Sequence, residues 1–155
     1  MPEFITYITI HRYTIIGSTL LACFAGYVAY LNFSINNFNV ASVKFRSAIL
    51  AELGALYPIP TVWPKNEDAF FKDAFPNLQI AVTEFRHFVP CYLHRSFDNA
   101  WLCYYSAYPK DTKDQIYHHY MAFHDIGETQ QDGEARRNKT FHANVSNLLS
   151  FAKNK

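Results

Sequence analysis

The first part of the chain is hydrophobic without interruption by charge. From Tyr13 to Phe33, 21 consecutive residues carry no charged side chain. As a helix this run would extend roughly 31 Å, because each residue adds about 1.5 Å, and that length matches the hydrocarbon core of a bilayer. Aromatic rings, which favour membrane interfaces, lie towards both ends of the run, at Tyr7, Tyr13, Tyr27, Tyr30 and Phe33. We therefore expect residues 1–33 to be an N-terminal segment with an uncleaved transmembrane anchor.

Three other interpretations of this run remain open. A cleaved signal peptide fits the preceding His11 and Arg12, although the run is long for a signal and no clear small-residue cleavage site follows Phe33. Leu20-Leu21-Ala22-Cys23 resembles a lipobox, but the apolar run continues for ten residues past the cysteine. A buried core helix is the third interpretation, and such helices are seldom this long without a charge.

The charges that flank the run give a weak indication of orientation. Arg12 lies at its amino-terminal edge, whereas the first charges on the other side are Lys44 and Arg46. Positive charges close to a span tend to stay in the cytoplasm. We therefore expect a cytoplasmic amino terminus and a domain outside the cytoplasm, although a wider window removes the difference.

Hydrophobic residues beyond the run recur with helical spacing. Their positions are Phe38, Phe45, Ile49, Leu53 and Leu56. This stripe predicts an amphipathic helix that continues from the membrane to about Leu56. Three prolines then predict an extended connector at residues 57–65, which contains Trp63.

Three shorter helices are expected next. Asn66 is a suitable N-cap for the first, which Pro76 would end. Pro90 would close the second, and Ser96 is a candidate cap for the third, which ends before Pro109. The hydrophobic positions of the second and third helices are Leu78, Val82, Phe85 and Val89, and Phe97, Trp101, Tyr104 and Tyr108.

The last third of the chain mixes polar and apolar segments. Residues 116–123 are ambiguous between a strand and a helix, and residues 127–138 are expected to form a hydrophilic loop. A final helix is expected at residues 140–152. The predicted fold is mainly α, with a single N-terminal transmembrane helix followed by a compact helical bundle at residues 34–155.

Composition changes this picture only slightly. The net charge is +1, which gives no electrostatic reason to expect a nucleic-acid partner. Aromatic residues make up 17 % of the chain, so the core should be built from rings. Cys91 and Cys103 would pair in an oxidising compartment, but two buried free thiols are the favoured interpretation.

A histidine cluster is the first candidate for chemistry. His118, His119 and His124 lie close to Asp125 and Glu128, and these residue types bind zinc and similar metals. However, adjacent histidines diverge on a strand or a helix, and no HExxH motif supports the cluster. We expect one histidine to pack among Tyr117, Tyr120 and Phe123 while the others face solvent, with no metal or other cofactor.

Two further candidates involve the aromatic segments. Cys103 lies beside Trp101 and Tyr104, and an apolar setting raises a thiol's pKa and makes it inert rather than nucleophilic. Arg86 and Asp98 each lie among aromatic residues, where a charge either forms a partly buried ion pair or lies at an edge and reaches water. We expect the two to pair and to fix the packing of two helices. Trp101 is expected at the centre of the domain.

Small residues lie on one face of the predicted span. Ser18, Ala22 and Gly26 recur every four residues, and Ala25 and Ala29 widen the strip. Small side chains let helix backbones approach closely in lipid. We expect Ser18, Ala22 and Gly26 to contact a second helix, from another copy or from a partner complex, although such residues are also common in spans that do not associate.

Several aromatic motifs resemble those of a known group of proteins. The motifs are Phe85-Arg86-x-Phe88-x-Pro90, Phe97-Asp98-x-Ala100-Trp101, Tyr117-His118-His119-Tyr120 and Leu148-Leu149-x-Phe151-Ala152. Together they resemble a group of small bacterial proteins of unknown function that begin with one predicted span. The resemblance implies a bacterial, membrane-anchored helical protein in the inner membrane, and it implies no activity.

The sequence contains no motif that names a reaction. We therefore expect a non-catalytic accessory or interaction protein that docks on itself or on a larger membrane complex. One alternative is a membrane-tethered sensing module that binds a small ligand in an aromatic pocket. A metal protein or enzyme that uses His118, His119 or His124 is a further alternative.

Overall fold

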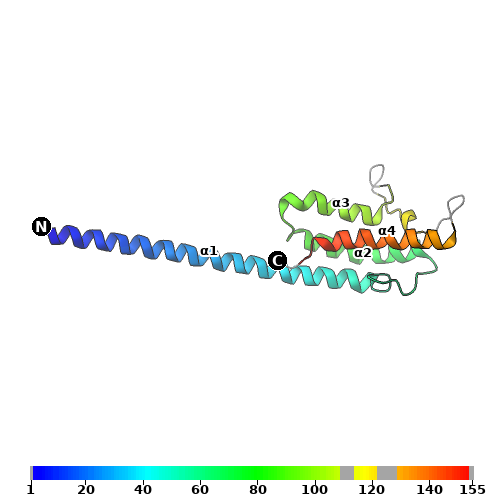
Figure 1. Cartoon of the computed structure of the whole chain (residues 1–155), viewed down its shortest axis with the longest axis horizontal. Coiled ribbons are helices and arrows are strands. Elements are labelled where there is room, and N and C mark those ends of the chain that lie inside the picture. The colour runs from blue at the N-terminus through cyan, green and yellow to red at the C-terminus, as the bar shows by residue number, and fades with distance from the viewer. Residues whose placement is uncertain (1, 109–113, 122–128, 154–155) are drawn as a thin grey trace. The chain divides into compact units, whose positions relative to one another are not determined.

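The chain is mainly α-helical, as the hydrophobic pattern predicts. The computed structural model describes residues 2–108, 114–121 and 129–153. Within those ranges four helices follow one another, which are α1 (Pro2–Leu53), α2 (Glu67–Arg86), α3 (His94–Tyr105) and α4 (Gln130–Ser150) (Figure 1). Short 3₁₀ turns, η1 (Cys91–Leu93) and η2 (His118–Tyr120), lie before α3 and between α3 and α4. The chain divides into two compact units, residues 1–37 and 38–155.

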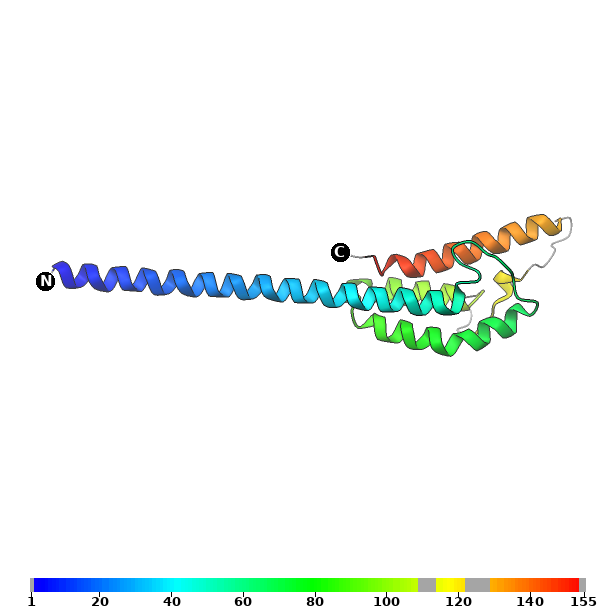
Figure 2. The same cartoon turned by 90° about the horizontal axis from the view of Figure 1, so that it is seen from below.

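The second unit is a helical bundle in which the end of α1 takes part. All five residues of the predicted stripe from Phe38 to Leu56 are buried. α2 runs antiparallel to α1, because Lys44 Nζ bonds Glu84 Oε2 at 2.7 Å while Asn77 Nδ2 donates to Glu52 Oε1, also at 2.7 Å. The two views of the ribbon show α2 and α4 on either side of this part of α1, with α3 beyond them across the bundle (Figures 1 and 2).

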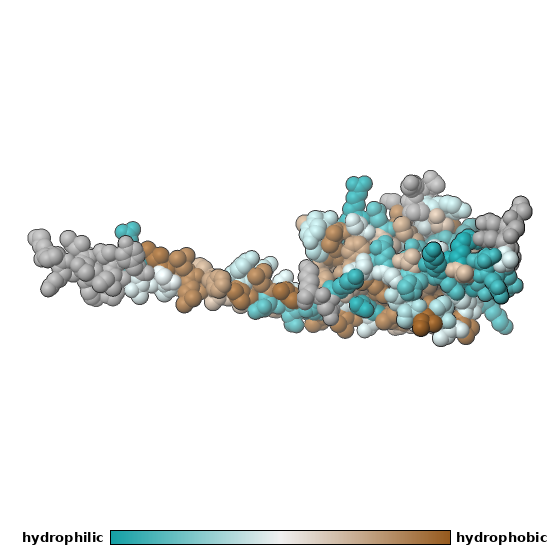
Figure 3. All heavy atoms as spheres, in the orientation of Figure 1, coloured by the Kyte–Doolittle hydropathy of each residue, from teal (hydrophilic) through white to brown (hydrophobic). Residues whose placement is uncertain are grey.

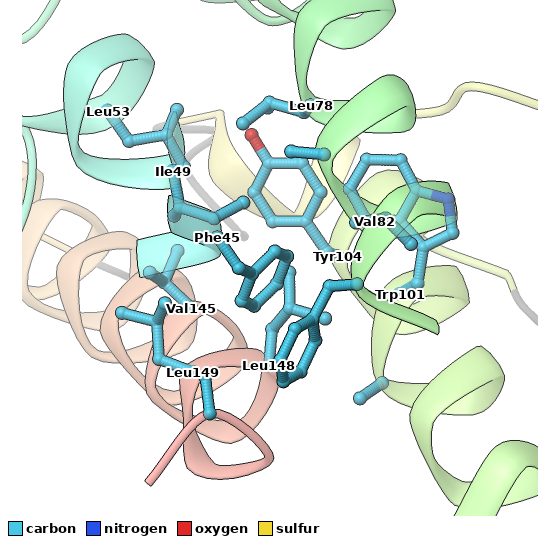
Figure 4. Packing of buried hydrophobic residues seen from close by; sticks show 14 of the residues in the cluster. Phe45, Ile49, Leu53, Leu78, Val82, Trp101, Tyr104, Val145, Leu148 and Leu149 are labelled. Carbon is cyan, nitrogen blue, oxygen red and sulfur yellow. The ribbon is translucent and has the colours of Figure 1, made fainter. Parts of the chain in front are cut away.

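Hydrophobic side chains from all four helices meet in one core. The residues labelled in Figure 4 are Phe45, Ile49 and Leu53 of α1, Leu78 and Val82 of α2, Trp101 and Tyr104 of α3, and Val145, Leu148 and Leu149 of α4. The Phe45 ring stacks on Phe85 with centroids 4.5 Å apart and meets Phe97 edge-on at 6.1 Å. Stacked and edge-to-face aromatic pairs therefore join α1, α2 and α3.

The prediction that Pro76 ends a helix is wrong. α2 begins after Asn66, whose side chain accepts a hydrogen bond from the Ala69 amide at 3.1 Å, and it then runs through Pro76 to Arg86. A proline inside a helix removes one backbone hydrogen bond and bends the axis. Here the helix bends in its middle (Figure 2), and buried Ala74 and Leu78 on either side keep both halves packed on the core.

The start of α3 also differs from the prediction. The helix begins at His94, directly after η1, so Ser96 lies inside it and does not cap it. Phe97, Trp101 and Tyr104 of the predicted stripe are buried. Tyr108 lies beyond the end of the helix and is exposed, because the chain leaves α3 at Ser106.

α4 is longer than the sequence indicates. Residues 130–138 belong to the helix, although their polar composition predicts a loop. Thr129 and Asp132 form a capping box in which the Thr129 hydroxyl accepts from the Asp132 amide at 3.3 Å. A cap with this geometry starts a helix even where the hydrophobic stripe is weak.

Residues 116–121 combine two kinds of local structure. Ile116 pairs with Ser106 in an isolated parallel bridge, and η2 follows directly. The ambiguous pattern at residues 116–123 is thus explained by a brief strand-like contact and a single 3₁₀ turn. Residues 122 and 123 lie outside the described part of the chain.

Candidate functional site

The uncharged run lies on α1 and is exposed within the first unit. Ile16–Leu53 is the one segment of the described chain that is long and apolar enough to cross a membrane, a criterion that a signal sequence near an N-terminus also meets. None of its most apolar window is buried by the rest of the chain. Figure 3 shows the hydrophobic side chains on this part of the helix, and the large exposed ones include Leu20, Leu21, Phe24, Tyr27 and Tyr30.

This exposure is energetically significant. Burying a large apolar side chain contributes about 1.5–3 kcal/mol, whereas a whole domain is stable by only about 5–15 kcal/mol. Leaving several such side chains exposed therefore forgoes a free-energy gain comparable to the stability of a whole domain. Covering these side chains with lipid or with another protein would supply that gain.

The three small residues of the predicted helix contact all lie on this exposed part of α1. Ser18, Ala22 and Gly26 are exposed. A Cβ atom built on Gly26 would meet nothing within 4 Å outside its own helix backbone. The face they share is thus open to another helix, and whether one binds there stays a prediction.

His119 is the histidine that packs into the bundle. Its ring lies against Tyr120, with centroids 3.8 Å apart. Burial lowers the pKa of His119 from 6.5 to about 4, while the nearby carbonyls of Tyr104, Cys103 and Ile116 oppose this shift. No atom meets hydrogen-bond geometry with either ring nitrogen. His119 is therefore neutral at pH 7 and packs as an aromatic ring.

The other histidines of the cluster do not join it at one site. His118 is exposed on η2. His124, Asp125 and Glu128 lie outside the described residues. Within the described ranges, no three His, Cys, Asp or Glu side chains are grouped so as to hold a metal ion.

A cluster of aromatic rings surrounds Tyr120. Phe71 stacks on Tyr117 at 5.1 Å and lies 5.1 Å from Tyr120, and Phe141 approaches Tyr120 edge-on at 5.3 Å. Burial raises the pKa of Tyr104, Tyr117 and Tyr120 above the ordinary tyrosine value, so all three phenols stay neutral. The cluster is a packed core of uncharged rings.

One polar side chain links this aromatic cluster to α4. Asn144 Nδ2 donates to the Tyr120 hydroxyl at 3.0 Å and to the Cys103 carbonyl at 3.1 Å. These two hydrogen bonds connect α4 with α3 and η2. Asn144 therefore fixes the position of η2, and the sequence pattern gave no sign of this role.

The cysteines are free thiols. Cys103 is half-buried on α3, whereas Cys91 on η1 is exposed. The expectation that both thiols are buried is therefore wrong for Cys91. Val89, two residues earlier, is buried, whereas no residue of η1 is.

Arg86 and Asp98 lie together at the turn between α2 and α3. Arg86 Nε and Nη2 donate to the two carboxylate oxygens of Asp98 at 2.7 and 2.9 Å. Both side chains are nearly half exposed, so the pair lies at an edge and reaches water. The hydrogen bonds from Arg86 lower the pKa of Asp98. Water screens such a pair, so it contributes little to stability.

Trp101 lies between α2 and α3. Its ring is buried and stacks on Phe75 and Tyr104 at 5.4 and 5.3 Å. Its indole Nε1 donates to Gln79 Oε1 at 2.9 Å. The residue therefore contributes both packing and a polar contact to the α2–α3 interface.

An arginine that the sequence analysis missed is the most buried charge among the described residues. Arg137 Nη1 donates to Glu67 Oε1 at 2.5 Å, with side-chain exposures of 9 % and 19 %. The guanidinium also lies over the Trp63 ring, 4.1 Å from its centroid, and Trp63 meets Phe141 edge-on at 5.6 Å. Arg137 therefore joins α4, the start of α2 and the proline-rich connector. The isolated Trp63 in that connector was the only signal in the sequence.

Comparisons with known proteins identify no family for this chain. No protein-family description matches it, and neither a curated protein nor a solved structure is similar to it.

Proposed function

We propose that the protein is a non-catalytic, membrane-anchored interaction protein that docks on itself or on a larger membrane complex. The observation that supports this proposal best is the exposed hydrophobic surface of α1 between Ile16 and Phe33. A helix of this length and composition is stable in a bilayer, because lipid covers its side chains and all its backbone hydrogen bonds are internal.

The candidate chemistry described above also favours an interaction role. His119 is neutral and packed, the buried tyrosines are neutral, and the ion pair of Arg86 and Asp98 lies at a surface turn. Each of these groups has a structural role that accounts for its position. Large exposed side chains such as Phe88 and Tyr92 add surface of the kind that protein interfaces use.

The proposal includes a location. We assign the chain to a bacterial inner membrane, on the resemblance of its aromatic motifs, with the second unit outside the cytoplasm. Arg12 supports this orientation, because it is the nearest charge to the hydrophobic run.

Membrane fractionation and co-purification test the proposal. The full-length chain should sediment with membranes and resist extraction by alkaline carbonate, and intact-mass spectrometry should show an unprocessed amino terminus. Purification in mild detergent should recover a stoichiometric partner or a homo-oligomer. Recovery of the full-length chain in the soluble fraction, or of a mature form that begins at a lipidated Cys23, would contradict the proposed anchor.

A further inference from the structure

The part of α1 that belongs to the bundle, from Phe38 to Leu53, has hydrophobic residues on two faces, one towards the core and one on the opposite side. The inward stripe consists of Phe38, Ser42, Phe45, Ile49 and Leu53, all buried. Figure 4 shows the last three of these in the core. The outward stripe consists of Val40, Val43, Ser47 and Leu50, and its apolar members are 63 %, 56 % and 38 % exposed. One turn of helix separates each residue of the outward stripe from the next. This part of α1 is therefore hydrophobic on both sides although only one side is packed.

The spacing of the outward stripe is that of a coiled coil. Its residues follow one another at intervals of three, four and three, which places them at the a and d positions of a heptad. Side chains at a and d positions pack into the gaps of the same stripe on a second helix, so the stripe is complementary to itself.

We propose that the protein forms a parallel homodimer in which α1 of one copy packs against α1 of a second copy along Val40, Val43, Ser47 and Leu50. The inference rests on the proposed function, because the membrane anchor makes every copy of α1 leave the bilayer in the same direction. The α1 helices of two anchored copies therefore run parallel, and each residue lies at the same distance from the membrane in both copies. Confinement to one membrane also raises the effective concentration of the second copy.

The charges beside the stripe are compatible with a parallel pair in register. In a parallel coiled coil, each g residue lies near the e residue five positions later in the partner. Arg46 would then lie opposite Ala51 of the second copy, and Lys44 opposite Asn39. Lys44 is also paired within its own chain with Glu84. No two like charges meet, so electrostatic repulsion does not oppose this arrangement.

Three small residues of the uncharged run, Ala22, Gly26 and Ala29, have the same heptad phase along the sequence, whereas Ser18 and Ala25 do not. Steps of three and four residues lead from Gly26 through Ala29, Phe33 and Asn36 to Val40. Small residues favour close helix contacts in lipid, and aliphatic residues favour them in water. The heptad series is thus small at Gly26 and Ala29 and mainly aliphatic from Val40 onward, with Phe33 and Asn36 between the two parts.

Disulfide cross-linking of the full-length chain in its membrane tests the dimer. The three native cysteines are replaced by serine, and single cysteines are introduced as Val43→Cys, Leu50→Cys or, as the control, Thr83→Cys on the exposed side of α2. After mild oxidation, Val43→Cys and Leu50→Cys should each form a covalent dimer and Thr83→Cys should not. In mild detergent, Val43→Glu should shift the molar mass from dimer to monomer, while Thr83→Glu should leave the dimer intact.

The outcomes separate this inference from the proposed function. Carbonate-resistant chains whose Val43→Cys variant cross-links no more than the Thr83→Cys control would overturn the dimer and leave the anchor intact. Cross-linking of Val43→Cys to a different protein would overturn the dimer as well. A chain that carbonate removes from the membrane would overturn both the anchor and the parallel arrangement that depends on it.

Discussion

Neutral aromatic side chains dominate the interior of the bundle. Tyr104, Tyr117 and Tyr120 are fully buried, and their raised pKa values keep the phenols protonated. Burial disfavours the charged form of His119 as well, and because this form is the protonated one, the pKa of its imidazole falls to about 4. These ionisable side chains of the core are therefore all uncharged near pH 7, because burial shifts their pKa values away from neutrality.

His119 should make the stability of the protein depend on pH. Its pKa is 6.5 when unperturbed and about 4 in the folded chain. Between these two values the unfolded chain binds more protons than the folded chain, so the free energy of unfolding falls as the pH falls through this window and is unaffected above it. Thermal unfolding of the full chain in detergent should therefore show a larger loss of Tm between about pH 7.5 and about pH 5 than the His119→Gln variant shows. Equal losses would contradict this account of His119.

At the scale of elements, contacts between helices override several local signals. α2 continues through Pro76 because residues on both sides of it pack on the core. α4 extends across a polar segment because it is capped at Thr129 and because Arg137 on that segment binds Glu67 at the start of α2. The two helices therefore stabilise each other's amino-terminal ends.

Breaking the Arg137–Glu67 pair should destabilise the bundle strongly. Removing one partner of a buried pair leaves the other charge buried alone, which typically costs about 3–5 kcal/mol. Arg137→Ala should therefore lower the free energy of unfolding by about that amount, whereas the exposed neighbour Lys139→Ala should change it by less than about 0.5 kcal/mol. Denaturant titration measures both. The double variant Arg137→Leu with Glu67→Leu should recover part of the loss, and strictly additive losses would show that the two residues do not interact.

At the scale of the whole molecule, the two units differ in what covers their hydrophobic residues. Among the residues whose burial is described, those of the core all lie between Phe38 and Ala152, so the second unit has a core of its own. In the first unit, the large apolar side chains from Ile16 to Phe33 are exposed within the chain. Deletion of residues 1–33 should therefore remove the need for detergent and leave the fold intact.

The deletion variant should be soluble, show a helical circular dichroism spectrum and unfold cooperatively. Hydrophobic residues such as Val40, Val43, Ile59 and Phe88 remain exposed in it, but folded proteins commonly carry such side chains at their surface. A variant that aggregates, or that melts without a cooperative transition, would show that the second unit depends on the first for its stability.

Local pattern alone determined the helical class, the hydrophobic segment of α1, the cap at Asn66, and most of the buried stripes, because these depend on residues three or four positions apart. The tertiary structure decided the rest. The passage of α2 through Pro76, the burial of Arg137 and the two hydrogen bonds of Asn144 all depend on partners far away in the sequence. The outward stripe on α1 depends both on the sequence pattern and on the tertiary structure. Its spacing is present in the sequence, but only the packed bundle shows which of the two hydrophobic faces of α1 is left exposed.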